Sequence, residues 1–332
     1  MPVNPEKLKS VKEFSHKNIF FAVARTSAGR TFVGCSDFKV HEVDIAAAKP
    51  ELKEIGGHDS YVTGLALAGN VLVSGGYDGQ LNWWDIDSKK QIRKVAAHQK
   101  WIRDVQASKD GKLIASVADD MVARLWDARS GKLVHELRGH KEITPHHFIS
   151  MLYACTFSPD GKLIATADKV GHVVIWDTAT GSQVGTLEAP TMYTWDPVQR
   201  RHSIGGIRSV AFSPDVRLLA VGGMGKVGNI DHLEGKTRVE IFDWRSGKRE
   251  IEFPGDKFNG LVNQLAFDPT GSWLLGAGGA NDGFLMFFDL KAKKAIRQDK
   301  VAMHIHDIAV NDTADTILAA GHGKLIQYEL KG

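Results

Sequence analysis

Residues 98–127 read HQKWIRDVQASKDGKLIASVADDMVARLWD, and they form the most regular unit in the chain. The unit contains three short runs rich in β-branched and aliphatic residues, WIRDVQA, KLIASVA and VARLWD. The turn signals SKDG and ADD separate these runs, a pattern typical of short antiparallel strands joined by tight turns. Four side chains mark fixed places in the unit: His98 before the first run, Ser116 in the second, Asp120 in the turn and Trp126 in the third. The stretch therefore predicts a small β-sheet.

The same unit recurs along the chain. Its third run ends at seven places: Asp44, Asp85, Asp127, Asp177, Asp243, Asp289 and Glu329. A further run follows most of these endings and can supply a fourth strand, whereas the sequence has no long helical pattern. A period of about 40 residues with this strand–turn–strand texture indicates a β-propeller.

In detail, these units resemble WD repeats over essentially the whole chain. Gly-His or Ala-His precedes the first strand at 57–58, 97–98 and 139–140. SPDG-like turns occur at 108–111, 158–161, 213–216 and 268–271, and Trp-Asp ends the third strand at 84–85, 126–127 and 176–177. In whole-chain features the sequence also resembles WD-repeat proteins of planctomycete-type bacteria. The resemblance implies an all-β, seven-bladed WD40 β-propeller with four-stranded antiparallel blades.

The expected blades together fill a single domain, 1–332. Their approximate bounds are 16–57, 58–97, 98–139, 140–189, 190–256, 257–301 and 302–332. The last unit ends after its third strand, and a strand-like segment at about 6–14 precedes the first unit. We expect 6–14 to join the C-terminal blade (about 302–330) and close the ring, because this pairing removes two exposed strand edges.

The resemblance also implies a buried hydrogen-bond chain from Trp through Ser and His to the turn Asp. Two units match it fully, with His58, Ser74, Asp78 and Trp84 in one and His98, Ser116, Asp120 and Trp126 in the other. A third has His140, Thr166 and Trp176, but Val170 stands at the Asp position. A His beside Ser and Asp could also suggest a hydrolytic triad. Recurrence in two units favours a structural role, so we expect no catalytic residue here.

Three insertions lengthen the regular unit, at 141–152, 189–206 and 222–237. Each lies in a connection between the second and third strands or between one unit and the next. In an antiparallel meander these connections share one end, so we expect the insertions to cluster on one sector of the top face. Long loops in a compact domain are usually functional. With neighbouring positions they give a candidate interaction surface: Tyr61, Tyr77, Trp101, Asp119, His146, His147, Tyr193, Trp195, Arg200, Arg201, His202, His232 and His304.

Composition argues against several other functions. With 42 Lys and Arg against 39 Asp and Glu the net charge is +3, which predicts no broad basic face for nucleic acid. No apolar run is long enough for a membrane span, and residues 1–14 lack the apolar region of a signal peptide. The two cysteines, Cys35 and Cys155, form neither a disulfide framework nor a zinc spacing and are expected to be buried. We expect no metal or cofactor and a cytoplasmic location.

The sequence favours a non-enzymatic scaffold that presents its loop-decorated top face to a protein or peptide and is monomeric on its own. One alternative is a small-ligand-binding or enzymatic propeller with a pocket under the loops of the fourth and fifth blades (140–189 and 190–256). Another is a structural module of a larger assembly. Arg103, Arg208, Asn263 and His306 share one place in the first strand of several units. We expect them to line the central channel, either as a solvated wall or as a site for an anion or a phosphorylated peptide.

Overall fold

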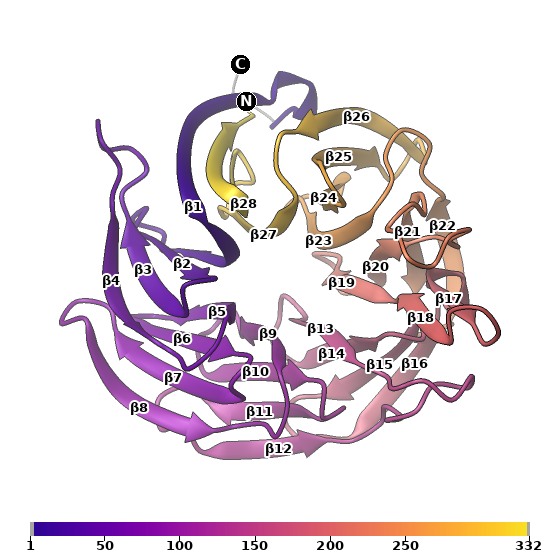
Figure 1. Cartoon of the computed structure of the whole chain (residues 1–332), viewed down its shortest axis with the longest axis horizontal. Coiled ribbons are helices and arrows are strands. Elements are labelled where there is room, and N and C mark those ends of the chain that lie inside the picture. The colour runs from indigo at the N-terminus through magenta and orange to yellow at the C-terminus, as the bar shows by residue number, and fades with distance from the viewer. Residues whose placement is uncertain (1–2, 331–332) are drawn as a thin grey trace.

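The computed structural model describes residues 3–330 as a ring of β-sheets around a central channel (Figure 1). Within these residues there are five four-stranded sheets, one six-stranded sheet, one two-stranded hairpin and two short 3-10 helices. All the strand pairs are antiparallel, as the alternation of short runs and tight turns predicts. Neither helix in this part of the chain is long and apolar enough to cross a membrane.

Each four-stranded sheet is built from consecutive strands. They are β5 (Val62–Ala68), β6 (Val71–Gly76), β7 (Gln80–Asp85) and β8 (Lys90–Ala96); β9 (Ile102–Ala107), β10 (Leu113–Ala118), β11 (Ala123–Asp127) and β12 (Leu133–Leu137); β13 (Leu152–Phe157), β14 (Leu163–Asp168), β15 (His172–Asp177) and β16 (Gln183–Glu188). The remaining two are β19 (Ile207–Phe212), β20 (Leu218–Met224), β21 (Thr237–Asp243) and β22 (Lys248–Phe253); β23 (Leu261–Phe267), β24 (Trp273–Gly279), β25 (Gly283–Asp289) and β26 (Lys294–Val301).

The six-stranded sheet joins the two ends of the chain. Its order is β27 (Ile305–Val310), β28 (Thr316–Glu329), β1 (Lys9–Arg25), β2 (Thr31–Cys35), β3 (Lys39–Val43) and β4 (Leu52–Gly57). Helix η1 (Pro5–Lys7) precedes it. Helix η2 (Pro190–Met192) leads into the hairpin of β17 (Tyr193–Asp196) and β18 (His202–Gly205).

Hydrophobic side chains fill the spaces between neighbouring sheets. Trp83 of β7, for example, packs in one cluster with Ile102 and Val105 of β9 and Ile114 of β10. The middle strands are therefore buried on both faces, whereas an outer strand such as β8 is mostly exposed. Removing each large apolar side chain from water stabilises the fold by about 1.5–3 kcal/mol. The core is thus a set of clusters distributed around the ring.

The predicted closure of the ring is present. The first part of β1 pairs with the second part of β28, from Lys9 opposite Glu329 to Ser15 opposite Lys324. Figure 1 shows indigo β1 beside yellow β28, near the two termini. The chain reverses within β28 at Gly323, whose φ of 70° suits glycine, and the Leu330 N–H donates to the Asp315 carbonyl. One strand from the N-terminus thus covers the edge that the C-terminal strands leave open.

The predicted count of seven four-stranded blades is wrong. Within residues 3–330 the ring contains six sheets of four or more strands. The physical reason is the length of β1, which runs for 17 residues without a break. Its first part pairs with β28 and its last part, Phe20–Arg25, pairs with β2, so hydrogen bonds join the first and last predicted blades into one sheet.

We predict that deleting residues 1–15 lowers the thermal stability strongly and promotes self-association. The deletion leaves the second part of β28 as an open edge with unpaired N–H and C=O groups, which invites pairing with another chain. Differential scanning fluorimetry and size-exclusion chromatography measure both effects. The control is a chain that begins at Asn4 and keeps the helix η1 cap. Equal melting temperatures for the two chains would contradict a stabilising role for the closure.

Candidate functional site

Three of the four-stranded sheets contain a linked chain of buried polar side chains. In the sheet β5–β8, Trp84 Nε1–H donates to Ser74 Oγ at 2.8 Å, and Ser74 Oγ lies 2.8 Å from His58 Nε2. His58 Nδ1 is 3.0 Å from Asp78 Oδ1. The hydroxyl can accept from Trp84 and donate to His58, which leaves the Nδ1–H for the carboxylate. Every member is satisfied, the condition under which a buried polar network stabilises a fold.

The sheet β9–β12 repeats this arrangement with almost the same distances. Trp126 Nε1 is 2.9 Å from Ser116 Oγ, His98 Nε2 is 2.7 Å from the same oxygen, and His98 Nδ1 is 3.1 Å from Asp120. Burial would raise the pKa of Asp120, but hydrogen bonds and charge from His98 and then Arg124 outweigh it and hold that pKa far below its usual range. The carboxylate therefore stays ionised and ties the loop before β9 to the turn after β10.

The third network, in β13–β16, corrects one expectation from the sequence. The carboxylate at the Asp position comes from Asp168, two residues before Val170, and its Oδ2 is 2.9 Å from His140 Nδ1. Thr166 Oγ1 contacts both His140 Nε2 at 2.9 Å and Trp176 Nε1 at 3.0 Å. Residues i and i+2 of a strand share a face, so Asp168 at the end of β14 reaches the same histidine as Thr166. The network is complete in this sheet too.

The remaining units use other contacts at these positions. Asp37 accepts from Asn18 at 2.6 Å and lies 3.0 Å from His41 Nε2. At the Trp position Phe242, Phe288 and Tyr328 are buried and pack in apolar clusters. Donor atoms of Cys35, Asp37 and His41 lie within 4.8 Å of one another, which is a possible metal-ligand set. Burial, then the charge of Asp37, raises the pKa of the Cys35 thiol, which disfavours the thiolate that a metal needs.

We predict that Asp120→Ala destabilises the protein by about 2–3 kcal/mol, because it leaves the buried His98 without its acceptor. Asp87→Ala serves as the control, since Asp87 is 71% exposed and its ion pair with Arg30 contributes at most about 1 kcal/mol. Urea denaturation measures both free energies of unfolding. Equal losses would contradict the structural interpretation of the network in β9–β12.

The three inserted segments contact one another, and we call them together the insertion cluster (141–152, 189–206 and 222–237). The Tyr193 hydroxyl is 3.0 Å from Thr144 Oγ1 and joins the first segment to the second. The Val227 N–H donates to Thr194 Oγ1 at 3.1 Å and joins the second to the third. An ion pair of 2.8 Å between Arg200 and Asp231 links the same two segments. The cluster is thus an ordered unit with its own hairpin and its own contacts.

Aromatic rings gather in two places on the side of the ring that carries the insertions. Within the cluster, His146 stacks on Trp195 with ring centroids 3.5 Å apart. Beside the channel, an aromatic arc of Phe38, Tyr61, Tyr77 and Trp101 runs through successive ring contacts of 5.4, 5.9 and 4.5 Å. Trp101 is 49% exposed and Trp195 42%, values unusual for such large rings. Both places offer apolar area to a partner.

The predicted surface residues divide into exposed and buried ones. Tyr61, Trp101, His147, Trp195, Arg200, Arg201, His202 and His232 are exposed, and Tyr77 and His146 are partly so. The prediction is wrong for Asp119, Tyr193 and His304, which are each 8% exposed. Asp119 accepts two hydrogen bonds from Arg103, and His304 donates to the Ala280 carbonyl, so internal contacts hold them. Phe38, exposed with a φ of 71°, was missed because nothing near it resembles an insertion.

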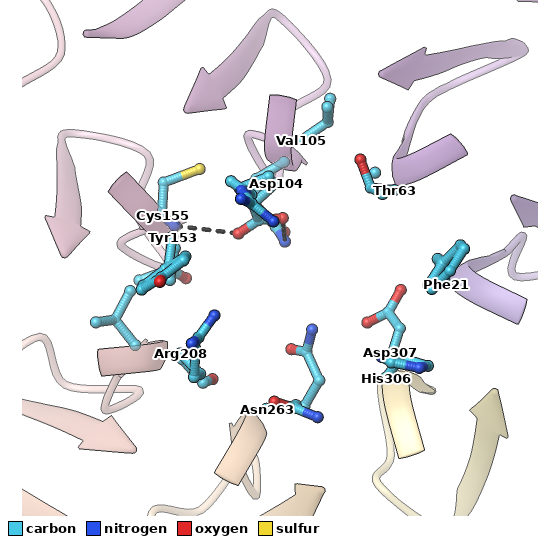
Figure 2. Close-up of a pocket in the computed structure, with 18 of the residues that line it drawn as sticks. Phe21, Thr63, Asp104, Val105, Tyr153, Cys155, Arg208, Asn263, His306 and Asp307 are labelled. Atoms are coloured by element: carbon cyan, nitrogen blue, oxygen red, sulfur yellow. Dashed lines mark hydrogen bonds between the residues drawn. The ribbon is translucent and has the colours of Figure 1, made fainter. Parts of the chain in front are cut away.

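The central channel is lined by one residue from each inner strand at the same level. These residues are Phe21, Thr63, Arg103, Tyr153, Arg208, Asn263 and His306, around a cavity of about 330 Å³ (Figure 2). Several wall residues bind the neighbouring inner strand: Thr63 donates to the Ile102 carbonyl at 2.7 Å and Asn263 to the Ile305 carbonyl at 2.8 Å. These contacts tie adjacent sheets together around the channel.

Two carboxyl groups in the channel wall accept hydrogen bonds from neighbouring inner strands, whereas Thr63 and Asn263 donate them. Asp104 accepts the Cys155 N–H at 3.1 Å, the bond drawn in Figure 2, and Asp307 accepts the Val23 N–H at 2.7 Å. Burial raises the pKa of Asp104, and burial raises the pKa of Asp307 to about 7. Both groups accept a backbone N–H from the neighbouring inner strand, so we interpret them as links in the wall and not as an acid–base pair.

The raised pKa of Asp307 predicts a pH-dependent stability. Between its unfolded pKa, near 4, and about 7 the folded protein holds a proton that the unfolded chain has lost. Stability therefore falls as pH rises through this range and is level above it. We predict that Asp307→Asn, which keeps an acceptor for Val23, melts higher than the wild type at pH 8 and alike at pH 4. The expected gain is on the order of a few kcal/mol; equal melting at pH 8 would contradict the raised pKa of Asp307.

A closed ring of antiparallel sheets around a channel defines this protein as a β-propeller. The family model for the WD domain, G-beta repeat, matches residues 49–85, 89–127, 131–177, 195–227 and 247–289. These segments cover more than half of the sequence, so the chain belongs to the WD40 repeat family.

The chain is also similar to proteins with three unrelated names. The chain is 32% identical over 142 residues to nuclear distribution protein PAC1-2 of Uncinocarpus reesii, covering 39% of the chain and 31% of that protein. It is 28% identical over 236 residues to eukaryotic translation initiation factor 3 subunit I of Scheffersomyces stipitis, covering 70% of the chain and 60% of that protein. Similarity to telomerase protein component 1 of Rattus norvegicus is 26% and covers 77% of the chain but 8% of that protein. The chain thus spans less than two thirds of each of these relatives.

Proposed function

We propose that this chain is a non-enzymatic scaffold that binds a protein or peptide through the face that carries the insertion cluster. The single observation that carries the proposal is the ordered joining of three insertions beside exposed aromatic rings. Loops that are long without a function would not be expected to bond to one another. These insertions do, through the hydrogen bonds from Tyr193 to Thr144 and from Val227 to Thr194. Rigid, exposed aromatic side chains are typical anchors of protein interfaces.

Family membership supports the same function. WD40 propellers generally act as scaffolds that bind protein partners. The Scheffersomyces stipitis relative is, by its name, one subunit of a translation initiation factor. We extend this kind of role to the present chain, and we propose that it is a monomer on its own and works in the cytoplasm.

The alternative of an enzymatic pocket finds less support in the channel. The carboxyl groups with raised pKa values, Asp104 and Asp307, accept backbone hydrogen bonds that tie neighbouring inner strands together. The His–Ser–Asp groups form networks in the sheet interior, with a buried Trp at the other end. Neither arrangement leaves a free acid–base pair in a cavity, which is what an acid–base enzyme requires.

We predict that Trp195→Ala and Trp101→Ala each reduce partner capture by the full chain about tenfold, with no loss of thermal stability comparable to that of Asp120→Ala. Affinity capture with quantitative mass spectrometry from an extract of the source organism measures the effect. Ile92→Ala is the matched control, because Ile92 is an exposed apolar residue of the outer strand β8. Identical capture by wild type, Trp195→Ala and Trp101→Ala would contradict the proposed surface.

A further inference from the structure

Three cationic side chains converge where the channel opens toward the insertion cluster. Arg103 projects from β9 and Arg208 from β19, and both line the channel cavity. Lys169 lies in the turn between β14 and β15, with its backbone N–H bonded to the Met151 carbonyl. Burial and then the positive charge of Arg208 lower the pKa of Lys169, the negative charge of Asp119 opposes them in part, and Arg103 lowers the pKa further. We call this group of three the channel mouth.

Only one of the three cations has a full set of partners. Arg103 donates to both oxygens of Asp119, at 2.8 and 2.6 Å, and to the Tyr77 hydroxyl at 2.7 Å. Arg208 stacks on the Tyr153 ring at 3.6 Å and donates one bond of 3.3 Å to the Gly205 carbonyl. Its Nε–H is buried and has no acceptor among residues 3–330. Arg208 therefore keeps an unused donor at the channel.

Lys169 is also short of partners. It is 7% exposed, and its Nζ lies 3.5 Å from the Ile149 carbonyl, at the limit of a hydrogen bond. Neither Lys169 nor Arg208 forms an ion pair with a carboxylate in the part of the chain that the structure describes. Enclosing two unpaired cations is costly, so an anionic group from outside would relieve this cost and satisfy the free donors.

We propose that the channel mouth binds an acidic side chain of a partner polypeptide, whose carboxylate lies between Arg208 and Lys169. The planar guanidinium of Arg208, already fixed by Tyr153, presents adjacent donors that match the two oxygens of a carboxylate. This inference rests on the proposed function, because it names the chemistry of the partner that the same face would bind.

The surroundings of the mouth define the rest of the partner segment. The aromatic arc borders the mouth on one side, because Arg103 lies over the Trp101 ring at 5.2 Å and Tyr61 contacts Tyr77. On another side lies Ile149, which is 63% exposed and whose carbonyl faces Lys169. Apolar rings around a charged centre suit an acidic residue flanked by apolar ones. Truncating one side of a desolvated charge pair costs far more than truncating an exposed one, so the carboxylate supplies specificity and the rings supply buried area.

The deeper channel favours a carboxylate over a phosphoryl group. The carboxyl groups of Asp104 and Asp307 line the wall of the same cavity. Burial raises the pKa of both groups, that of Asp307 to about 7, so they are only partly ionised near neutral pH, and whatever negative charge they carry repels a doubly charged phosphoryl group more strongly than a single carboxylate. The small volume, about 330 Å³, accommodates one side chain and not a folded loop.

The test uses the full chain and oriented libraries of short peptides with randomised flanks and a fixed central Glu, Gln or phosphoserine. Retained peptides are quantified by mass spectrometry for wild type, Arg208→Gln and Lys169→Gln. Lys109→Gln is the matched control, because exposed Lys109 lies in the turn between β9 and β10, at the opposite end of the sheet. Inorganic phosphate is added as a competitor to identify a site that takes only the free ion.

We expect the Glu library to be retained about tenfold better than the Gln library, with apolar residues enriched beside the Glu. Arg208→Gln and Lys169→Gln should each abolish this preference, and Lys109→Gln should keep it. Arg208→Lys retains the charge without the planar fork and should weaken binding in part; it also replaces Arg208→Gln if that variant does not fold.

Four results would overturn the inference. They are equal retention of the Glu and Gln libraries, retention of phosphoserine peptides alone, displacement by phosphate without any peptide preference, and an unchanged Glu preference in both charge-removing variants. If Trp195→Ala and Trp101→Ala lose partner capture and any of these four results is also found, only the proposed carboxylate site is contradicted. The proposed scaffold function is then still supported. Unchanged capture in those two variants would instead contradict the proposed surface itself.

Discussion

The pairing of β1 with β28 is the contact on which the rest of this structure depends. Each sheet packs only against its two neighbours, so the ring holds its shape only when the first and last strands meet. Lys9 to Ser15 supply that meeting by covering the edge at residues 324–329. The same strand then continues into the inner wall of the channel. The position of the channel residues therefore follows from the closure of the ring.

The buried networks perform a second, local task. A loop between two sheets carries backbone polar groups that must find partners, and His58, His98 and His140 each join such a loop to a neighbouring turn. Because each hydroxyl bonds both a histidine and a tryptophan, loop, turn and third strand are fixed together. Three consecutive sheets have this device, and the insertion cluster begins where the third of them starts. The three sheets with these networks therefore support the segments that we propose as an interaction surface.

The channel mouth differs from the rest of the channel wall in the hydrogen bonding of its polar side chains. The wall positions that bond to the next strand, such as Thr63 and Asn263, have their polar atoms occupied. Arg208 and Lys169 differ because neither has an ion pair with a carboxylate within residues 3–330, Arg208 Nε–H has no acceptor there, and Lys169 Nζ has only a long contact with the Ile149 carbonyl. Two cations without ion pairs, enclosed beside exposed aromatic rings, support the proposal that an anionic group of a partner binds between them.

The sequence by itself determined the β-propeller, the strand order, the closure and the identity of the networks in β5–β8 and β9–β12. Turn chemistry and the spacing of His, Ser, Asp and Trp are local, so they can be read along the chain. The tertiary structure alone decided that Asp168 replaces the expected carboxylate at Val170, since the two-residue shift depends on which face of β14 points to His140. It also decided that β1 fuses two predicted blades and that Asp119, Tyr193 and His304 are buried. Arg208 lies in the inner strand β19 and Lys169 in the turn after β14, 39 residues apart, and only the folded ring brings their charges together.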